Sequence, residues 1–311
     1  MWLYPYQLYT RAIHISKING LENILLSIDE TKYNNMFGYY NEIKYLFTVE
    51  GLTEQIIKIN ACDDTKISLC IPTKNRFDDF LTRYLDEYVK YLQNGIIDEI
   101  VICDETGDDY SKIIAKYGSL INNDNKFKVY QNNEVLGVFK NKLKVCSLAK
   151  NDFIALIDSD NFADEDYFKT AKSYIEKNNL QPSNNFILAP SHAKPNFDYT
   201  KYNNVLVNKE NMKHLFHDMT FQCCMNTGNY ILNKSFVGSI KYNDSIMKQI
   251  SACDVLYFNL LAFQQISSLT LHVVPNLHYT RVVHDDSEYL KTNHLCAEYR
   301  DNVIIPKFYN L

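Results

Sequence analysis

Short apolar runs alternate with amphipathic stretches from about residue 68 onward, which is typical of β-strands that alternate with α-helices. The runs are apolar at consecutive positions, as strands are when helices cover both faces of a parallel sheet. The four strand candidates are ISLCI, EIVIC, KFKVY and FIALI. The pattern therefore predicts an α/β fold of the Rossmann-like type, with a mostly parallel central sheet and helices on both faces.

The stretches between these runs have helical periodicity. Residues 77–92 place their apolar side chains on one face of a predicted helix. A second helix is predicted to begin with the acidic residues 108–109 and to end at Gly118, and a third spans residues 138–150. The acidic triplet at residues 164–166 has no apolar strand before it, so we expect it to be an ordinary helix start.

The pattern is less regular in the second half of the chain. Strands are predicted at residues 185–190, 229–232 and 269–274, and a helix is predicted near residues 247–265. The polar stretch over residues 191–218 is rich in Asn and Tyr and is predicted to be a long loop.

Composition and charge exclude several classes of protein. The chain has 311 residues, a net charge of −5 and no stripe of Lys or Arg interleaved with aromatic residues, so we expect no nucleic-acid partner. Its eight cysteines form no C-x-x-C pair, which argues against a zinc site and suits small core residues in a reducing compartment. A G-x-G-x-x-G motif, which a dinucleotide dehydrogenase would carry, is absent.

Membrane and export signals are also lacking. The N-terminal residues have no basic region followed by an apolar core, and no run of about 18 apolar residues occurs in the chain. We therefore expect a soluble, cytoplasmic protein without a transmembrane segment. Peripheral membrane association through the aromatic N-terminal residues stays open as an alternative.

Polar side chains follow the predicted strands. Asp158 and Asp160 come directly after the fourth strand, Asn75 follows the first and Asp104 follows the second. Ligands of an open α/β sheet bind beyond the carboxyl ends of its strands, so these side chains are expected to face one crevice. An Asp-x-Asp triplet alone is a weak signal because chance produces it in chains of this size. Each acid could instead cap a helix or lie in a solvated loop.

The order and spacing of four blocks over residues 68–161 resemble the nucleotide-sugar-binding half of GT-A fold glycosyltransferases, most closely the inverting family 2. The blocks are ISLCIPTKNR, DEIVICDETGDD, NNEVLGVFKNK and FIALIDSDN. Two later stretches extend the resemblance, namely SACDVLYFNLLAF and YTRVVHDDS. The first is similar to the helix that carries the general base of that family, and the second is similar to its late Arg-x-x-His segment.

The resemblance implies roles for residues of the first half. Asp160 would bind a divalent metal, Mn²⁺ or Mg²⁺, and Asp158 would contact the sugar donor. Such ions prefer hard oxygen ligands and would neutralise a diphosphate leaving group. The remaining residues implied in donor or nucleotide binding are Thr73, Asn75, Arg76, Asp104, Lys140 and Asn141. Cys103, Glu105 and Cys253 depart from the residues that are usual in the family.

The resemblance also implies roles in the second half. Asp254 would be the general base that an inverting mechanism needs, His284 a further metal ligand, and Arg281 a partner of the phosphates. Gly228 and Asn229 lie in a small-residue turn that would approach the acceptor, and His217 and Asp218 are weaker candidates for the same pocket.

We therefore expect a metal-dependent inverting glycosyltransferase that moves a hexose-type sugar from a nucleotide-diphosphate sugar to a hydroxyl of a glycan or glycoconjugate. A UDP-sugar is favoured as donor, with a GDP-sugar as the alternative. The expected segments are an N-terminal extension of unknown role (1–66), the nucleotide-sugar-binding half (67–190), the acceptor-binding and catalytic half (191–290) and a C-terminal tail (291–311). Two other functions stay open: a catalytically degenerate domain that binds a sugar nucleotide or a partner, and an Asp-x-Asp phosphotransferase.

Overall fold

The computed structural model describes residues 65–282, 284, 285 and 287–311. Residues 65–311 form one compact unit. The extension predicted over residues 1–66 falls almost entirely outside the described residues. The boundaries predicted at residues 190 and 290 divide the chain by function and stay predictions.

A single mixed sheet runs through the described part of the chain in the order β3-β2-β1-β4-β8-β5-β9-β7, with β6 beside β5. Strands β1 to β4 are parallel, β8 is antiparallel to both β4 and β5, β9 is parallel to β5, and β7 is antiparallel to β9. The strands are β1 (Ile67–Thr73), β2 (Glu99–Asp104), β3 (Phe127–Gln131), β4 (Phe153–Leu156), β5 (Phe186–Lys194), β6 (Phe197–Asp198), β7 (Leu206–Val207), β8 (Ile231–Asn233) and β9 (Thr270–Thr280). The predicted mostly parallel α/β sheet is confirmed.

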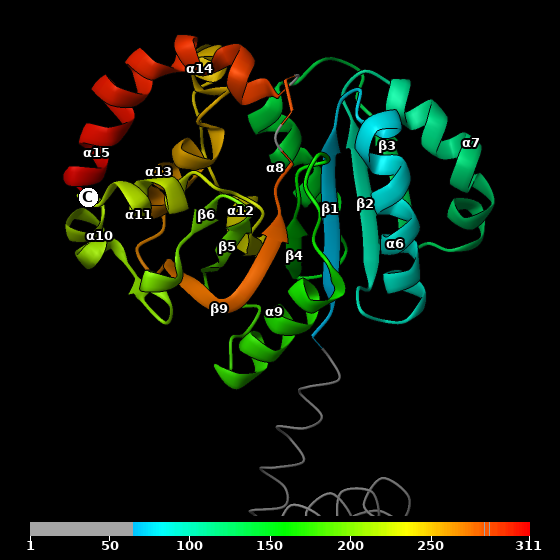
Figure 1. Cartoon of the computed structure of the whole chain (residues 1–311), viewed down its shortest axis with the longest axis horizontal. Helices are drawn as coiled ribbons and strands as arrows, with labels where there is room; N and C mark the ends of the chain where they lie inside the picture. The colour runs from blue at the N-terminus through cyan, green and yellow to red at the C-terminus, as the bar shows by residue number, and fades with distance from the viewer. Residues whose placement is uncertain (1–64, 283, 286) are drawn as a thin grey trace, which may run out of the picture. The chain divides into compact units, whose positions relative to one another are not determined.

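Helices cover both faces of the sheet (Figure 1). On one face lie α6 (Thr82–Gln93), α7 (Asp108–Asn123) and α9 (Glu165–Lys177). On the other lie α8 (Val138–Leu148), α12 (Lys234–Val237) and α13 (Asp254–Gln265). The remaining helices are α10 (Lys209–Leu215), α11 (Met219–Met225), α14 (Glu288–Tyr299) and α15 (Ile305–Tyr309), with shorter or irregular turns η1 (Phe77–Leu81), η2 (Thr200–Tyr202), η3 (Asp244–Ile250) and η4 (Arg300–Ile304).

Aromatic packing shows which helices share a face. Tyr88 of α6 contacts Phe168 of α9 with ring centroids 6.3 Å apart, and the Tyr117 hydroxyl of α7 donates to Asp86 of α6 at 2.7 Å. Across the sheet, Phe139 of α8 packs on Tyr257 of α13 at 5.4 Å. Every residue of β1 and β2 is buried, which agrees with the consecutive apolar positions of their sequences.

The predictions for the individual elements are mostly confirmed. The four strands of the first half, the strands β5 and β8, and the helix α8 lie close to the predicted ranges. Strand β9 continues past the predicted end to Thr280, and α13 begins later than predicted, at Asp254, after the turn η3. The acidic triplet at 164–166 does begin a helix, because Asp164 is the N-cap of α9 and accepts a hydrogen bond from the Tyr167 amide at 3.0 Å. None of the helices in the described ranges is long and apolar enough to cross a membrane.

Two predictions were wrong. Helix α7 does not end at Gly118 but continues to Asn123, because Leu120 and Ile121 extend its packing against the core. Residues 191–218 are not one loop: β5 continues to Lys194, and Asn208 caps α10 through a capping box.

The segment predicted as a C-terminal tail, residues 291–311, is mostly helical, and its buried Cys296, Ile304 and Phe308 pack against the core.

A buried carboxylate joins the amino ends of the parallel strands. Glu99 of β2 accepts hydrogen bonds from Ser68 Oγ of β1 at 2.6 Å, from Lys128 Nζ of β3 at 2.6 Å and from the Lys150 amide before β4 at 2.7 Å. Its side chain is 2% exposed, so these partners replace water for the charge. This cluster lies at the opposite ends of the strands from Asp104 and Asp158.

We predict that Glu99→Ala lowers the free energy of unfolding by about 2 to 4 kcal/mol, because it leaves a buried hydroxyl, an amide and an ammonium without their acceptor. Urea denaturation followed by circular dichroism measures the change. The matched control is Glu87→Ala, which removes an exposed glutamate paired with Lys90 on α6 and should leave the midpoint nearly unchanged. Equal midpoints for the two variants would contradict the role of Glu99.

Candidate active site

The candidate site lies at the carboxyl ends of β1, β2 and β4. Parallel pairing sets Thr73 of β1 beside Asp104 of β2, and Asp158 follows β4 on the other side of β1. All three ends therefore meet at one edge of the sheet, where ligands of α/β proteins bind. The predicted convergence of the strand-end blocks is present in the structure.

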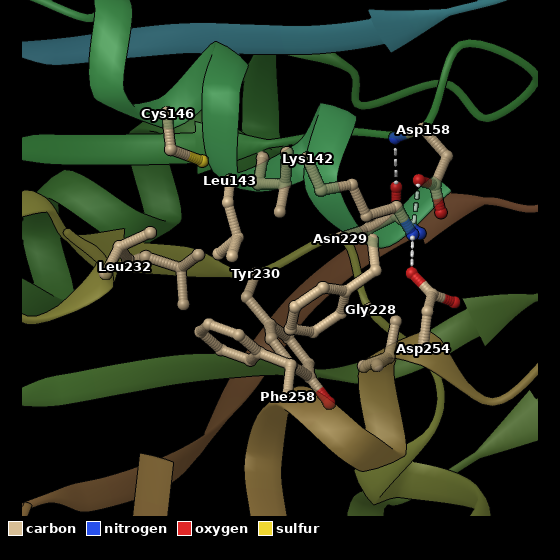
Figure 2. A pocket seen from close by; sticks show the side chains of 14 residues that line it. Lys142, Leu143, Cys146, Asp158, Gly228, Asn229, Tyr230, Leu232, Asp254 and Phe258 are labelled. Carbon is tan, nitrogen blue, oxygen red and sulfur yellow. Dashed lines mark hydrogen bonds and ion pairs between the residues drawn. The ribbon is translucent and has the colours of Figure 1, made fainter. Parts of the chain in front are cut away.

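Three charged side chains meet at the centre of this edge. The ammonium of Lys142 on α8 lies 2.8 Å from Asp158 Oδ1 and 3.0 Å from Asp254 Oδ2 at the start of α13. Figure 2 shows the lysine side chain extended between the two carboxylates. The side chains of Lys142 and Asp254 are only 12% and 11% exposed. The structure thus brings the predicted donor-side and base residues together through a lysine that the sequence analysis did not select.

Burial and charge act in opposite directions on these groups. Burial raises the pKa of Asp254, Lys142 lowers it, and Asp158 raises it, with the net result above the usual range of an aspartate. Burial would lower the pKa of Lys142, but the attraction of Asp158 and Asp254 outweighs it and holds that pKa above its usual value. Asp254 Oδ2 is the oxygen that faces Lys142, at 3.0 Å from its ammonium.

The turn before β8 holds Asp158 in place. Asn229 has a φ of 55°, and its Oδ1 accepts a hydrogen bond from the Asp158 amide at 2.8 Å. The hydroxyl of Tyr167 donates to the Asn229 carbonyl at 2.6 Å. Gly228 has a φ of +68°, and a Cβ there would lie 3.1 Å from Val255 Cγ2. A side chain at residue 228 would thus be strained and crowded against the start of α13.

A pocket opens beside the three charged groups and includes Gly228 and Asn229 in its wall. Figure 2 shows the charges at one end and Leu143, Cys146 and Leu232 toward the other. The pocket is therefore polar at the sheet edge and apolar toward the space between β4, β8 and α8.

Asp160 and His284 form a second group of interacting side chains. His284 Nε2 is 2.9 Å from Asp160 Oδ2, and the ring of Phe80 packs on the imidazole with centroids 4.9 Å apart. The two segments are brought together by backbone hydrogen bonds in both directions between Phe162 and Thr280, at 2.9 and 2.8 Å. The structure thus brings together the two residues predicted to bind metal.

The fit of a divalent metal can be judged from this donor set. Within the described ranges, no group of three or more His, Cys, Asp or Glu side chains could hold an ion. The protein would supply a carboxylate and an imidazole, while substrate phosphates and water complete the coordination. Mg²⁺ and Mn²⁺ are commonly bound in this way through one or two carboxylates plus phosphates, so the residues present fit such an ion.

A buried aspartate that the sequence analysis missed organises the end of β1. Asp109, in the first turn of α7, accepts hydrogen bonds from the Thr73 hydroxyl and from the amides of Arg76 and Phe77, the latter two at 2.9 Å. Asn75 lies in the left-handed region at φ 54°, and its Oδ1 accepts from the Thr106 hydroxyl at 3.0 Å. Thr73 and Asn75 therefore shape the turn of the predicted nucleotide site through contacts within the protein.

Asp104 and Glu105, at the end of β2, differ in whether their carboxylate oxygens already have hydrogen-bond partners. Both carboxylate oxygens of Asp104 are engaged, since they accept from the amides of Thr106 at 3.2 Å and Tyr110 at 2.9 Å. Glu105 is also buried, but its Oε1 has no hydrogen-bond partner among the described residues. Burial raises the pKa of Glu105, against the attraction of Lys74, whose ammonium lies 3.9 Å from Oε2.

Helix α8 turns its polar residues in different directions. Lys140 pairs with Asp244, whereas Lys142 faces the pocket. Asn141 is buried, with its amide bonded to the Cys103 carbonyl at 3.1 Å and its Oδ1 to Asn132 at 3.0 Å. The sequence did hold a signal for Lys142, because it lies in one row with the buried Phe139 and Cys146 at the spacing of a helix face.

The other candidates lie farther from the charged groups. The guanidinium of Arg281 stacks on the Phe197 ring at 5.2 Å, and the Arg281 amide donates to the Lys194 carbonyl. His217 stacks on Tyr309 of α15 at 4.7 Å. Asp218 caps α11 and pairs with Lys201 at 2.6 Å. His217 and Asp218 are absent from the wall of the described pocket around Lys142.

Comparison with known proteins adds to this picture. The model of the family described as glycosyl transferase family 2 matches residues 68–230, which is more than half of the chain. No curated protein sequence matches the chain.

Several solved structures of Staphylococcus aureus TarS are similar in fold. The fragment 1–349 has a TM-score of 0.52 at 18% identity, over 76% of this chain and 70% of that chain. The same fragment in complex with UDP-GlcNAc has a TM-score of 0.53 at 18% identity, over 72% and 60%. A longer TarS structure has a TM-score of 0.51 at 17% identity, over 76% and 40%. The chain thus belongs to glycosyl transferase family 2 and has the GT-A fold.

Proposed function

We propose that the protein transfers a sugar from a nucleoside-diphosphate sugar, with a UDP-sugar as the favoured donor, to a hydroxyl of a glycan or glycoconjugate in the cytoplasm. The observation that carries the proposal is the buried carboxylate of Asp254, held beside Asp158 at the carboxyl edge of the sheet. The donor class is supported by the similar fold of TarS, which has been solved with UDP-GlcNAc and with UDP.

The chemistry proposed for this site is a single displacement with inversion. The acceptor hydroxyl loses its proton to Asp254, and its oxygen forms a bond to the anomeric carbon. The bond from that carbon to the diphosphate breaks, and the nucleoside diphosphate leaves with the electron pair. Asp254 suits the role of base because it is held beside the donor-side carboxylate of Asp158 and because burial raises its pKa.

Asp160 and His284 are the residues that would hold Mn²⁺ or Mg²⁺. A bound ion would neutralise the charge that builds on the diphosphate. On the donor side, Asp158 has its backbone fixed by Asn229, so its carboxylate is oriented for a sugar or ribose hydroxyl. We assign the contact with the nucleobase to Glu105 rather than to Asp104. Of these two acids, only Glu105 keeps a carboxylate oxygen without a hydrogen-bond partner.

The alternative is a catalytically degenerate domain. It is supported by Cys103, Glu105 and Cys253, which differ from the residues that are usual in the family. The phosphotransferase alternative is not retained, because the family match covers the segment that holds Asp158 and Asp160.

We expect Asp254→Asn to lower the rate of nucleoside diphosphate release by about 10²- to 10⁴-fold, the usual contribution of a general base. The assay incubates the purified protein with a panel of UDP- and GDP-sugars and Mn²⁺, with and without an acceptor panel. Donor affinity, measured by calorimetry, should change little. The control is Asp166→Asn, an exposed acid in the first turn of α9.

The outcomes of this assay separate the alternatives. Failure of the wild-type protein to bind any sugar nucleotide contradicts the proposal. Binding without turnover favours the degenerate domain.

The rate should also depend on pH through Asp254. Because the folded-state pKa of this carboxyl is raised, the base is protonated and inactive up to a higher pH than an ordinary aspartate. The acid limb of the pH–rate profile is therefore expected above about pH 4, with activity gained as pH rises through it. An acid limb at or below the ordinary aspartate value, in a protein that stays folded there, would contradict the assignment.

Removal of the divalent ion should abolish turnover. We expect EDTA to stop nucleoside diphosphate release, added Mn²⁺ to restore it, and Asp160→Ala or His284→Ala to weaken Mn²⁺ binding in the presence of UDP. Loss of one ligand typically weakens binding because the ion has few protein ligands here. Calorimetric titration of Mn²⁺ gives the affinity, and Asp166→Asn again serves as the unaffected control. Full turnover in EDTA would refute the metal requirement.

A further inference from the structure

Lys142 is the buried cation of the site, and neither the base nor the donor contacts proposed above use it. Its ammonium joins two carboxylates that lie 96 residues apart in sequence, Asp158 after β4 and Asp254 at the start of α13. It reaches them from a third element, α8. The distances of 2.8 and 3.0 Å leave no room for an intervening water. Lys142 therefore fixes the positions of both carboxylates relative to each other.

Two carboxylates that share one cation disfavour each other's ionised form, and more so where water is excluded. Asp254 is the more deeply buried of the two, with 11% of its side chain exposed against 27% for Asp158. Without Lys142, burial and the charge of Asp158 would both favour the protonated form of Asp254. A protonated carboxyl cannot accept the proton of the acceptor hydroxyl.

We propose that Lys142 is a positioning residue that keeps Asp254 ionised and oriented as the base by tying it to the donor-side carboxylate of Asp158. The proposal rests on the proposed function of Asp254. It gives the lysine a role in the acceptor half of the reaction, whereas the family resemblance pointed to Lys140 and to the phosphates. Lys140 cannot substitute, because it pairs with Asp244.

In the described part of the site, Lys142 is the positively charged group that acts on Asp254. The charged and titratable groups that act on Asp254 are Lys142 from α8, Asp158 from the loop after β4, and the neighbouring Cys253. The segment before β8 contributes the backbone of Gly228 and the amide side chain of Asn226, which bonds to the Leu256 amide at 3.1 Å. None of the groups from that segment carries a charge.

The proposal is tested by titrating Asp254 itself. The carboxyl ¹³C resonance of Asp254 is assigned by its absence in Asp254→Asn and followed against pH in the wild-type protein and in Lys142→Met, which keeps the length of the side chain. Removing an adjacent opposite charge typically moves a carboxyl pKa by about one to three units. We expect the Asp254 titration to move upward by about one unit or more. An unchanged titration would overturn the proposal.

Three further variants complete the test. Lys116→Met removes a lysine that pairs with Asp86 between α7 and α6, away from the site, and should leave the Asp254 titration unchanged. If Lys142→Met does not fold, Lys142→Met combined with Asp158→Asn removes one charge of each sign and should still show an upward, smaller shift. Lys142→Arg keeps the charge and should restore most of the wild-type titration.

Turnover gives an independent readout. With the sugar nucleotide that the wild-type protein uses, and water as the acceptor, Lys142→Met should lose about tenfold or more in rate near neutral pH and recover as pH rises, because the ionised fraction of the base is what falls. A rate loss that pH does not alter would indicate a structural role only and overturn the proposal. If the wild-type protein has no turnover but the Asp254 titration still moves, the proposed function fails while the charge coupling stands.

Discussion

The ion pairs of Lys142 with Asp158 and Asp254 connect the three parts of the chain that make up the proposed active site. Asp158 ends the β4 block of the parallel half, Asp254 begins the apolar helix α13, and Lys142 extends from α8, which packs between them. A buried charge is tolerated only when its partners are held close, so the packing of α8 against β1, α12 and α13 must be accurate. The apolar row of Phe139 and Cys146 on either side of Lys142 provides that packing.

The contact between Asp160 and His284 likewise depends on tertiary packing. Asp160 and His284 are 124 residues apart, and no local pattern places them in contact. They meet because Phe162, two residues beyond Asp160, forms a backbone bridge with Thr280 at the end of β9. Strand β9 itself is positioned by its long parallel pairing with β5. The geometry of the proposed metal site thus depends on the register of β5 and β9, which are joined to the parallel half of the sheet through the antiparallel strand β8.

Several acids near the crevice bind the protein's own backbone. Asp109 accepts amide and hydroxyl hydrogen bonds from the turn after β1, and Asp104 accepts two amides at the start of α7. These contacts give the crevice a rigid floor before any substrate arrives, which is the condition for a preorganised site. Only some of the strand-end carboxylates therefore remain available to a ligand. In the described part of the chain, Oε1 of the buried Glu105 has no hydrogen-bond partner, and Oδ2 of Asp254 pairs with the ammonium of Lys142.

The sequence by itself determined the fold class and the neighbourhood of the site. Consecutive apolar positions and helical periodicity are local properties, and parallel strands necessarily bring their carboxyl ends to one edge, so Asp158 and Asp160 could be placed near Asn75 and Asp104 without coordinates. The tertiary structure decided which side chains face the pocket. Lys140 and Lys142 differ by about 200° around the axis of α8. The row with Phe139 and Cys146 marks the face that carries Lys142, but only the packing of α8 brings this face to Asp158 and Asp254. The same holds for Asp109, whose hydrogen bonds to residues 32 to 36 positions earlier in the chain leave no trace in a local pattern.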